Sequence, residues 1–209
     1  MPAPTVSPVF KPASGIYRYR AQGEEKVTAG SFAPCSWQLE TVTTTVHEES
    51  DGVSFDTVYD ENHKERSFFR FAPDGVWLTY WGAVITCSLA PPQHSEGPYD
   101  PPLLQMKLSF QDGAAWEGTS MMGKMTISYS GKVLGRETVH VPAGTFDAWV
   151  VETRTDYRGQ NPAFRAETRW YVPALGTWVK EKTSMSATRG KYTFHSDYTA
   201  QLATQPGPG

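Results

Sequence analysis

TRWYVPALGTWVKEK, residues 168–182, places aromatic side chains on both sides of a Pro and a Gly that stand three positions apart. Pro173 has no N–H to give to a strand ladder, so strand pairing is expected to stop there. Gly176 supplies a backbone conformation that other residues resist, which suits a turn. Trp170 and Trp178 flank this turn and are expected to cover its ends. The stretch therefore predicts a hairpin corner between two antiparallel strands.

The same order of residues recurs in the first half of the chain, in FRFAPDGVWL (69–78). A second pair of stretches also matches in order, AGSFAPCSWQLETVT (29–43) with AGTFDAWVVETRT (143–155). Self-similarity in a fixed order indicates repeated modules. We interpret the chain as two similar strand modules from a tandem duplication, with chance resemblance between strand-rich segments as the alternative. The residues of the first corner that match the second are Pro73, Gly75 and Trp77.

Period-2 alternation dominates the rest of the chain and is typical of half-buried strands. KYTFHSDYTAQL (191–202), KMTISYS (124–130) and GVSFDTVYD (52–60) each gather apolar residues on one face. In SWQLETVTTTVH (36–47) the parity of the apolar residues changes, and a β-bulge near Thr41 would return them to one face and bend the strand. No segment shows a 3.6-residue apolar stripe. We therefore expect a mainly β fold with little helix, a strongly curved antiparallel sheet (half-barrel or open barrel) of about eleven strands.

One β domain with two flanking segments follows from the distribution of Pro, Ser and Gly. The first residues are rich in Pro and Ser and are expected to form an extended tether. The stretch LAPPQHSEGPYDPP is expected to be a Pro-rich loop that joins the two modules. The expected boundaries are 1–14 for the tether, 15–203 for the domain, about 15–88 and 113–203 for its modules, 89–102 for the loop and 204–209 for a disordered tail.

Composition excludes some partners. The 209 residues carry a formal net charge of −3 with a pI near 6.0 and no cluster of Lys and Arg, so we expect no nucleic-acid partner. No run approaches the roughly 18 apolar residues of a membrane helix, so no transmembrane segment is expected. Residues 1–15 lack the apolar stretch of a signal peptide. Because a Pro- and Ser-rich tether commonly follows a removed leader or a lipidation site, the interpretation includes a lipid anchor in the native precursor.

Cys35 and Cys87 are the only cysteines, and their spacing matches no zinc or redox motif. They form either one disulfide, the reading that we favour, or two unrelated buried thiols. If residues 35–87 form four antiparallel strands, the two cysteines lie at the same end of a flat sheet, roughly 14 Å apart. A disulfide needs Cα atoms within about 7 Å. The bridge therefore requires a strongly rolled sheet, or a loop that carries Cys35 across it.

Motifs for catalysis or metal binding are missing from the sequence. The five histidines form no HxH, HxxxH or HExxH pattern, so no metal site is expected. DENHKE (60–65) is typical of a polar hairpin turn rather than a metal loop. GxSxG, P-loop and GxGxxG motifs do not occur, and the carboxylate pairs Glu24 with Glu25 and Glu48 with Glu49 fall in expected turns or strand edges. We expect no catalytic residue, no cofactor and no enzymatic activity.

GVWLTYWGAVITC (75–87) is apolar on both faces when strict alternation is assumed. A strand of this kind must be covered on both sides. Either a loop or a second sheet packs across it, for which the Pro-rich loop is the obvious candidate, or one face lines an apolar cavity. If one face lines a cavity, strict alternation puts Trp77, Trp81 and Ile85 together on that face. The residues expected to bind a hydrophobic ligand are Trp77, Trp81, Ile85, Tyr129 and Trp149.

Two stretches of the second half resemble a known family. VHVPAGTFDAWVVE (139–152) followed by RWYVPALGTWVKEK (169–182) is similar to the half-barrel envelope proteins of the lipoprotein-localisation-factor (LolA-like) kind. The likeness is strongest to their uncharacterised members, and it covers the last third of the chain. The matching positions are Gly144, Thr145, Phe146, Trp170, Tyr171, Pro173, Gly176, Val179, Lys180 and Glu181.

The resemblance implies a curved antiparallel sheet outside the cytoplasm, often lipid-anchored. In the carrier members of the family the concave side of the sheet takes acyl chains. This chain departs from those carriers, because no segment reads as a helix that would plug the concave face. The resemblance implies no catalytic residue.

Two functions of different classes follow. The first is a non-enzymatic cell-envelope or secreted protein that binds a hydrophobic or lipid-like ligand, and it predicts an apolar cavity of at least a few hundred Å³. The alternative is a structural or interaction module that contacts another envelope protein, with a solid core and a flat apolar patch or an unpaired sheet edge. A hydrolase would need a cleft that gathers distant polar residues. The expected location is extracytoplasmic, from the resemblance, the tether and the cysteine pair.

Overall fold

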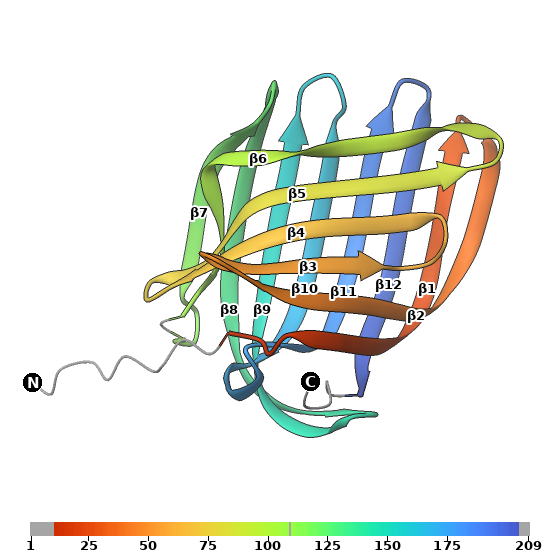
Figure 1. Ribbon diagram of the computed structural model, residues 1–209. Helices are drawn as coiled ribbons and strands as arrows, with labels where there is room; N and C mark the ends of the chain where they lie inside the picture. Colours follow the sequence, from red (N-terminus) through yellow and green to blue (C-terminus); the bar gives the residue numbers. More distant parts are fainter. Residues whose placement is uncertain (1–10, 109, 205–209) are drawn as a thin grey trace, which may run out of the picture.

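Twelve antiparallel strands account for nearly all of residues 11–108 and 110–204, which the computed structural model describes (Figure 1). Within these residues the only helical element is a 3₁₀ turn, so none is long and apolar enough to cross a membrane. The expectation of a curved antiparallel sheet with little helix is confirmed. The expected tether up to residue 10 and the tail from 205 lie outside the described residues. The elements are β1 (Gly15–Ala29), β2 (Phe32–Glu49), β3 (Gly52–Val58), β4 (His63–Ala72), β5 (Gly75–Cys87), β6 (Ala90–Lys107), β7 (Ala115–Met122), β8 (Met125–Val141), β9 (Gly144–Arg158), β10 (Ala163–Val172), η1 (Pro173–Leu175), β11 (Thr177–Arg189) and β12 (Tyr192–Thr204).

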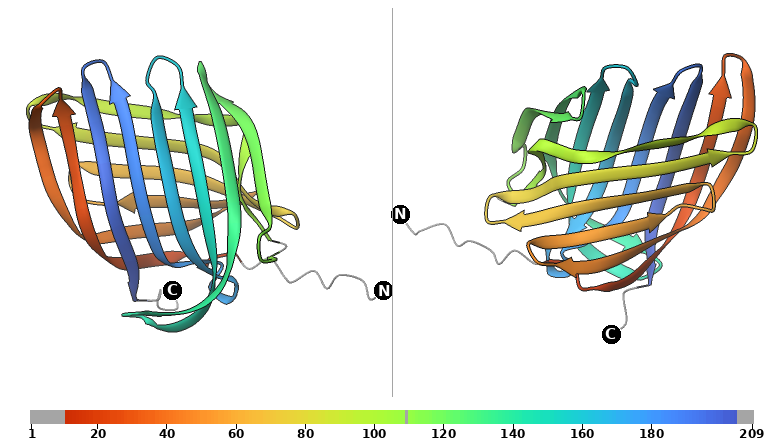
Figure 2. Two further views of the ribbon diagram at one scale, coloured as in Figure 1. Left: turned by 180° about the vertical axis from the view of Figure 1, so that it is seen from behind. Right: turned by 45° about the horizontal axis from the view of Figure 1, so that its top comes forward.

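Each strand pairs with its sequence neighbours, and β12 pairs with β1, so the sheet closes into a ring. Figures 1 and 2 show that β3–β6 run across β8–β12, while β1 and β2 turn the corner between the two directions. The ring is therefore a flattened barrel of two crossed layers, in which the inward faces of both layers form the core.

The side-chain parity of β2 changes where the sequence predicts a bulge. Glu40 and Thr41 are both exposed, while Leu39 before them and Val42 after them are buried. The ladder with β1 is irregular at this point, but the extra residue lies on β1, where Ala21 and Gln22 stand opposite Glu40. An irregularity of this kind increases the local twist of the sheet. The predicted change of parity is confirmed, whereas the expectation that β2 itself carries the bulge is wrong.

Of the Pro-rich stretch 89–102, expected as a loop, residues 90–102 are instead part of strand β6. It pairs with β5 over almost its whole length, but within the described residues its pairing with β7 is confined to Asp100 and Met121. Proline lacks the N–H of a ladder and is tolerated at the unpaired edge of a strand, so the prolines do not prevent strand formation here. This strand raises the number from about eleven to twelve, and it lies beside β5 instead of covering its face.

Strict alternation also fails in β5. The pairing of β5 with both neighbours skips Thr79, so the inward positions before and after it differ in parity. Leu78 faces the core before the irregularity, and Trp81 and Ile85 face it afterwards. Trp77 lies on the outer face, where its indole N–H donates to an exposed carboxylate of the β4–β5 turn. The expectation that Trp77 shares a face with Trp81 and Ile85 is wrong for this reason.

The two Pro–Gly corners use glycine for different reasons. Pro173 begins η1, and Gly176 ends it with a φ of 64°, which confirms the expected corner. Pro73 lies in the β4–β5 turn, but Gly75 belongs to β5 and has an ordinary φ. A Cβ there would lie 2.6 Å from the backbone oxygen of Met106 on β6. Close approach of β6, and not a turn conformation, therefore requires glycine at this position.

The matched stretches occupy different places in the strand order. In the first half they cover the β1–β2 and β4–β5 hairpins, and β3 lies between them. In the second half they cover the β8–β9 and β10–β11 hairpins, which follow each other directly. If the two halves arose by duplication, strand β3 must have been added to the first half. The duplication stays a hypothesis.

Cys35 and Cys87 form a disulfide, with Cα atoms 5.9 Å apart. The first half of β2 pairs with β1 alone, because β3 pairs only with the second half of β2. The end of β5 reaches this uncovered part of β2 directly. The bridge thus closes a corner that no backbone ladder closes, and the predicted disulfide with a strongly rolled sheet is confirmed.

Loss of the disulfide is expected to cost about 2–4 kcal/mol of unfolding free energy, because the bridge restrains the unfolded chain across a sequence separation of 52 residues. Urea unfolding followed by tryptophan fluorescence, with and without dithiothreitol, measures the effect. The variant Cys35→Ala/Cys87→Ala is the matched control, since its midpoint should be low and insensitive to the reductant. Equal midpoints of the unaltered protein under both conditions would contradict the expectation.

Candidate functional site

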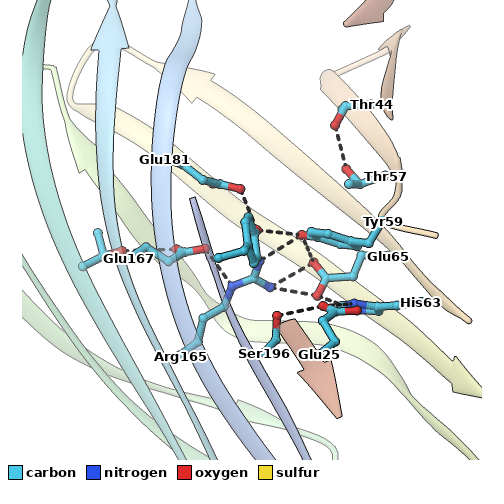
Figure 3. A network of polar contacts seen from close by, with 12 residues as sticks. Glu25, Thr44, Thr57, Tyr59, His63, Glu65, Arg165, Glu167, Glu181 and Ser196 are labelled. Carbon is cyan, nitrogen blue, oxygen red and sulfur yellow. Dashed lines mark hydrogen bonds and ion pairs between the residues drawn. The ribbon is translucent and has the colours of Figure 1, made fainter. Parts of the chain in front are cut away.

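The interior of the barrel holds a connected network of ionised side chains (Figure 3). Such side chains are almost never buried unless they are paired. They come from three distant parts of the chain, β1, β4 and the β10–β11 hairpin, so only the closed ring brings them together. The charged members, called the ionic network below, are Glu25 of β1, His63 and Glu65 of β4, Arg165, Glu167 and Arg169 of β10, and Glu181 of β11.

Strand β10 supplies both guanidinium groups by simple alternation. In AFRAETRWY (163–171), the side chains of Arg165, Glu167 and Arg169 point inward together with that of Tyr171. The residues between them, such as Trp170, take the outer face, because successive side chains of a strand point to opposite sides.

Arg165 joins the two layers of the barrel. Its Nη1 donates to both carboxylate oxygens of Glu65, at 2.9 and 3.0 Å, and its Nε donates to Glu167 at 2.7 Å. Arg169 extends the chain of contacts, with Nη2 donating to Glu167 at 2.7 Å and Nε to Glu181 at 2.9 Å. Each guanidinium is therefore held between two carboxylates, which offsets the cost of removing the charges from water.

His63 links this chain of contacts to Glu25. Its Nδ1 donates to Oε1 of Glu25 at 2.8 Å, while its Nε2 lies 3.3 Å from Oε1 of Glu65, at ion-pair distance but without hydrogen-bond alignment. Glu25 is fully buried and also accepts from Ser196 Oγ at 2.7 Å and from Trp37 Nε1 at 3.0 Å. Three donors therefore satisfy this carboxylate.

The environment shifts the pKa values of five network members, His63, Glu65, Arg165, Glu167 and Arg169, toward their charged forms. Burial alone would lower the pKa of His63, but the charge and hydrogen bond of Glu25, with the contribution of Glu65, raise that pKa to about 9. Burial likewise acts to raise the pKa of Glu65, yet Arg165 and His63 hold it well below its usual range. The raised pKa of His63 makes its imidazole a third cation beside the two guanidinium groups.

Two tyrosines complete the network as neutral donors. The Tyr198 hydroxyl donates to Oε1 of Glu181 at 2.7 Å, and the Tyr59 hydroxyl donates to Oε2 of Glu65 at 3.3 Å. Burial, together with these carboxylates, raises the pKa of both hydroxyls well above the ordinary value, so both keep their protons. Because every carboxylate is turned to a cation or a hydroxyl, no three potential metal ligands converge within the described part of the chain.

Three cavities of about 50, 40 and 50 Å³ adjoin one another around the network. The central cavity shares Phe55 and Trp178 with the second, and it shares Trp81, Tyr157 and Arg165 with the third. All three are much smaller than the few hundred Å³ expected for a lipid-sized ligand. We call them the central, apolar and rim cavities. The walls of the central cavity include Glu65, Arg169 and Glu181, and those of the apolar cavity include Phe71, Met106 and Tyr171. The walls of the rim cavity, near one end of the barrel, include Met122, Met125 and Met185.

The walls of each cavity include a residue with a buried polar atom that has no hydrogen-bond partner among the described residues. Trp81, with Nε1 unpartnered, lines the central and rim cavities. Gln93, with Nε2 unpartnered, lines the rim cavity, and Gln105, with Oε1 unpartnered, lines the central and apolar cavities. A buried polar group without a partner costs about 1–3 kcal/mol. A molecule that enters the cavities and pairs with these atoms would recover that free energy.

The structure does not gather the five residues that the sequence predicted to bind a ligand. Trp81 lines two cavities, whereas Ile85 is buried in a separate apolar cluster next to the disulfide. Trp77 lies on the outer face, Trp149 stacks on the β6–β7 connection, and Tyr129 covers a glycine of β7. Ligand binding therefore stays a prediction, and its geometry now rests on Trp81.

Sequence reasoning missed the ionic network. Glu25 was expected in a turn or at a strand edge, but it is fully buried in the middle of β1, with Val27 on the same face. The polar turn predicted for residues 60–65 ends at residue 62, and His63 and Glu65 already point inward from β4. Charged residues in phase with buried apolar ones were the signal that could have revealed them.

Comparison of the chain with protein-family models, with curated proteins and with solved structures finds no match. The resemblance to LolA-like proteins thus stays a prediction. Function has to be argued from the cavities, the ionic network and the surface.

Replacement of Arg165 by Met is expected to destabilise the fold by about 3–5 kcal/mol, because Glu65 and Glu167 would stay buried without their shared cation. The matched control is Arg66→Met, on the strand position next to Glu65, where an exposed ion pair with Asp56 should contribute less than about 1 kcal/mol. Urea unfolding measures both. A small and equal effect of the two substitutions would show that the network does not hold the interior together.

His63 should make stability depend on pH. Its pKa is about 9 in the folded chain against 6.5 for an ordinary histidine, so the folded state binds the proton more tightly. The contribution, about 3 kcal/mol, is fully present below about pH 6.5 and is lost as the pH rises through about 9. Unfolding free energies across this range should fall for the unaltered protein and fall less for His63→Gln. The exposed His94→Gln should leave the slope unchanged, and an unchanged slope in His63→Gln would refute a protonated imidazole.

Proposed function

We propose that the chain is a non-enzymatic extracytoplasmic protein whose barrel holds a small, mainly hydrophobic ligand that carries a hydrogen-bonding group. The observation that carries this proposal is the set of unpartnered buried atoms, Trp81 Nε1, Gln93 Nε2 and Gln105 Oε1, on adjoining cavities. Binding sites for small molecules typically combine apolar walls with a few convergent polar groups, and these cavities have both.

The chemistry of the walls indicates the kind of ligand. The rim cavity offers three methionines, which adapt their shape to an apolar body. Trp81 Nε1 and Gln93 Nε2 are both donors, so the polar group of the ligand should be an acceptor, such as a hydroxyl, carbonyl or carboxylate oxygen. The volumes favour a short chain or a single ring. A full acyl chain would require Arg165 and Trp81, which separate the rim and central cavities, to move.

Location and anchoring are also part of the proposal. The Cys35–Cys87 disulfide supports a place outside the cytoplasm, because disulfides persist in oxidising compartments. The resemblance to LolA-like envelope proteins agrees with a cell-envelope or secreted protein, and with a lipid anchor in the native precursor.

Ser196, His63 and Glu25 are the residues that most resemble a catalytic triad, but their contacts indicate a structural role. In serine hydrolases a histidine accepts the serine proton and a carboxylate orients the histidine. Here Ser196 Oγ and His63 Nδ1 both donate to the same oxygen of Glu25, so the serine proton is directed to the carboxylate and not to the imidazole. All three residues are buried away from solvent, which supports the absence of an enzymatic role.

The alternative is a module that binds another envelope protein and no small ligand. The observation in its favour is the edge of β6, which pairs with β7 only at Asp100 within the described residues. Pro91, Pro92 and Pro98 stand on this strand, and prolines blunt an edge against the addition of further strands. We therefore rank this function second.

Native mass spectrometry of the purified protein, followed by titration with octanol and octanoate, tests the first function. We expect a co-purified small molecule or uptake of a probe, and about tenfold weaker binding in Trp81→Phe, since the acceptor of the ligand would lose its buried donor. Trp77→Phe is the control, because it is the same substitution in the same strand on the outer face. If no small molecule co-purifies and neither probe binds, the interaction module becomes the better function.

A further inference from the structure

Five hairpin turns lie side by side along one edge of the barrel, the upper edge in Figure 1, also seen in both views of Figure 2. They connect β1 to β2, β5 to β6, β7 to β8, β9 to β10, and β11 to β12. We call these turns, each with one flanking strand residue on either side, the rim. It consists of residues 29–32, 87–90, 122–125, 158–163 and 189–192.

Contacts between neighbouring hairpins make the rim continuous. Thr188 N donates to the backbone oxygen of Pro162 at 2.9 Å, which joins the β11–β12 and β9–β10 hairpins. Thr28 pairs with Thr193, which sets the β1–β2 turn beside the β11–β12 turn. The disulfide fastens the β5–β6 turn to the β1–β2 hairpin, and Gly159 lies against the β7–β8 turn. The five turns therefore form a single surface.

All the charged side chains of the rim are positive. It contains four Lys and Arg residues and no Asp or Glu, and none of the four forms an ion pair within the described residues. The six other strand connections, counted in the same way, contain six carboxylates and one lysine. A chain of net charge −3 thus concentrates positive charge on one edge. The four rim cations are Lys124, Arg158, Arg189 and Lys191.

Large apolar side chains project from the same edge. Phe32 is 62% exposed and Leu89 is 64% exposed, and they are the two most exposed large hydrophobic residues in the described part of the chain. Each stands at the tip of a hairpin, and the Cys35–Cys87 bridge holds the two tips together. Met121, also exposed, adjoins the third turn. Apolar residues held at protruding tips beside cationic turns suit insertion between headgroups better than a flat protein interface.

We propose that the rim docks on a bilayer that contains anionic lipids. The four cations meet the lipid phosphates, and Phe32 and Leu89 enter the boundary between headgroups and acyl chains. The rim cavity, whose walls include Arg189, then lies directly behind the docked surface. The proposal does not depend on a ligand in the cavities, because it rests on charge and exposure alone.

Vesicle co-sedimentation of the full chain tests the docking. The unaltered protein should bind vesicles of phosphatidylcholine with about 30% phosphatidylglycerol, should not bind pure phosphatidylcholine, and should dissociate as the salt rises from about 0.1 to 0.5 M. Lys124→Gln/Lys191→Gln should weaken binding about 25-fold, at about fivefold per charge. Phe32→Ser/Leu89→Ser should weaken it at least about tenfold.

Matched controls are Lys132→Gln/Lys182→Gln and Leu134→Ser, which alter exposed residues on the outer faces of β8 and β11 and should leave binding unchanged. Circular dichroism and melting curves confirm that each variant folds, and the charge and apolar variants test the rim independently.

The proposal would be overturned by equal binding to neutral and anionic vesicles, by no binding to either, or by an equal loss of binding in rim and control variants. Binding to an acidic protein in place of the vesicles would overturn it as well. Trp81→Phe should retain vesicle binding, which separates this result from the test of ligand binding.

Discussion

Arg165 must be neutralised inside a barrel from which most water is excluded, and this requirement organises the interior. The guanidinium lies on β10, while one of its carboxylates, Glu65, lies on β4 in the opposite layer. Both carboxylate oxygens of Glu65 accept from the same nitrogen, Nη1, and charge-assisted hydrogen bonds of this kind are short and strong. The pair thus sets the distance between the crossed layers, and the contacts through Glu167 and Arg169 pass the constraint along β10 to β11.

The same constraint explains why the interior is neither an empty pocket nor a solid apolar core. Charged groups that satisfy one another cannot shift to fill every space, as aliphatic side chains do, so small gaps stay between the network and the aromatic walls. The walls of three such gaps include residues with a buried polar atom that has no hydrogen-bond partner among the described residues. A barrel of this kind would select small ligands with a polar group, because a purely apolar guest would leave these atoms without partners.

Closure of the sheet depends on local irregularities of the strands and on the disulfide. The ladder between β1 and β2 is irregular opposite Glu40, the irregularity at Thr79 changes which side chains of β5 face the core, and the disulfide joins two hairpins where no ladder forms. These devices also shape the surface, since they set two exposed apolar tips beside a row of cationic turns. The interior and the rim are thus products of one arrangement, although the functions proposed for them are independent.

The sequence by itself determined the class of the fold. Alternation, the Pro173–Gly176 corner, the change of parity near Thr41 and the cysteine pair all predicted a curled antiparallel sheet, because each depends on neighbours in the chain. It did not reveal that residues 90–102 form part of a strand, because the near absence of pairing along one edge of β6 is what makes prolines acceptable there. Nor did it reveal the ionic network: Glu25, His63 and Arg165 look like surface residues when only their own segments are considered. Ring closure alone decided that they face one another, because a charge can be buried only where a partner from a distant strand compensates for the loss of water.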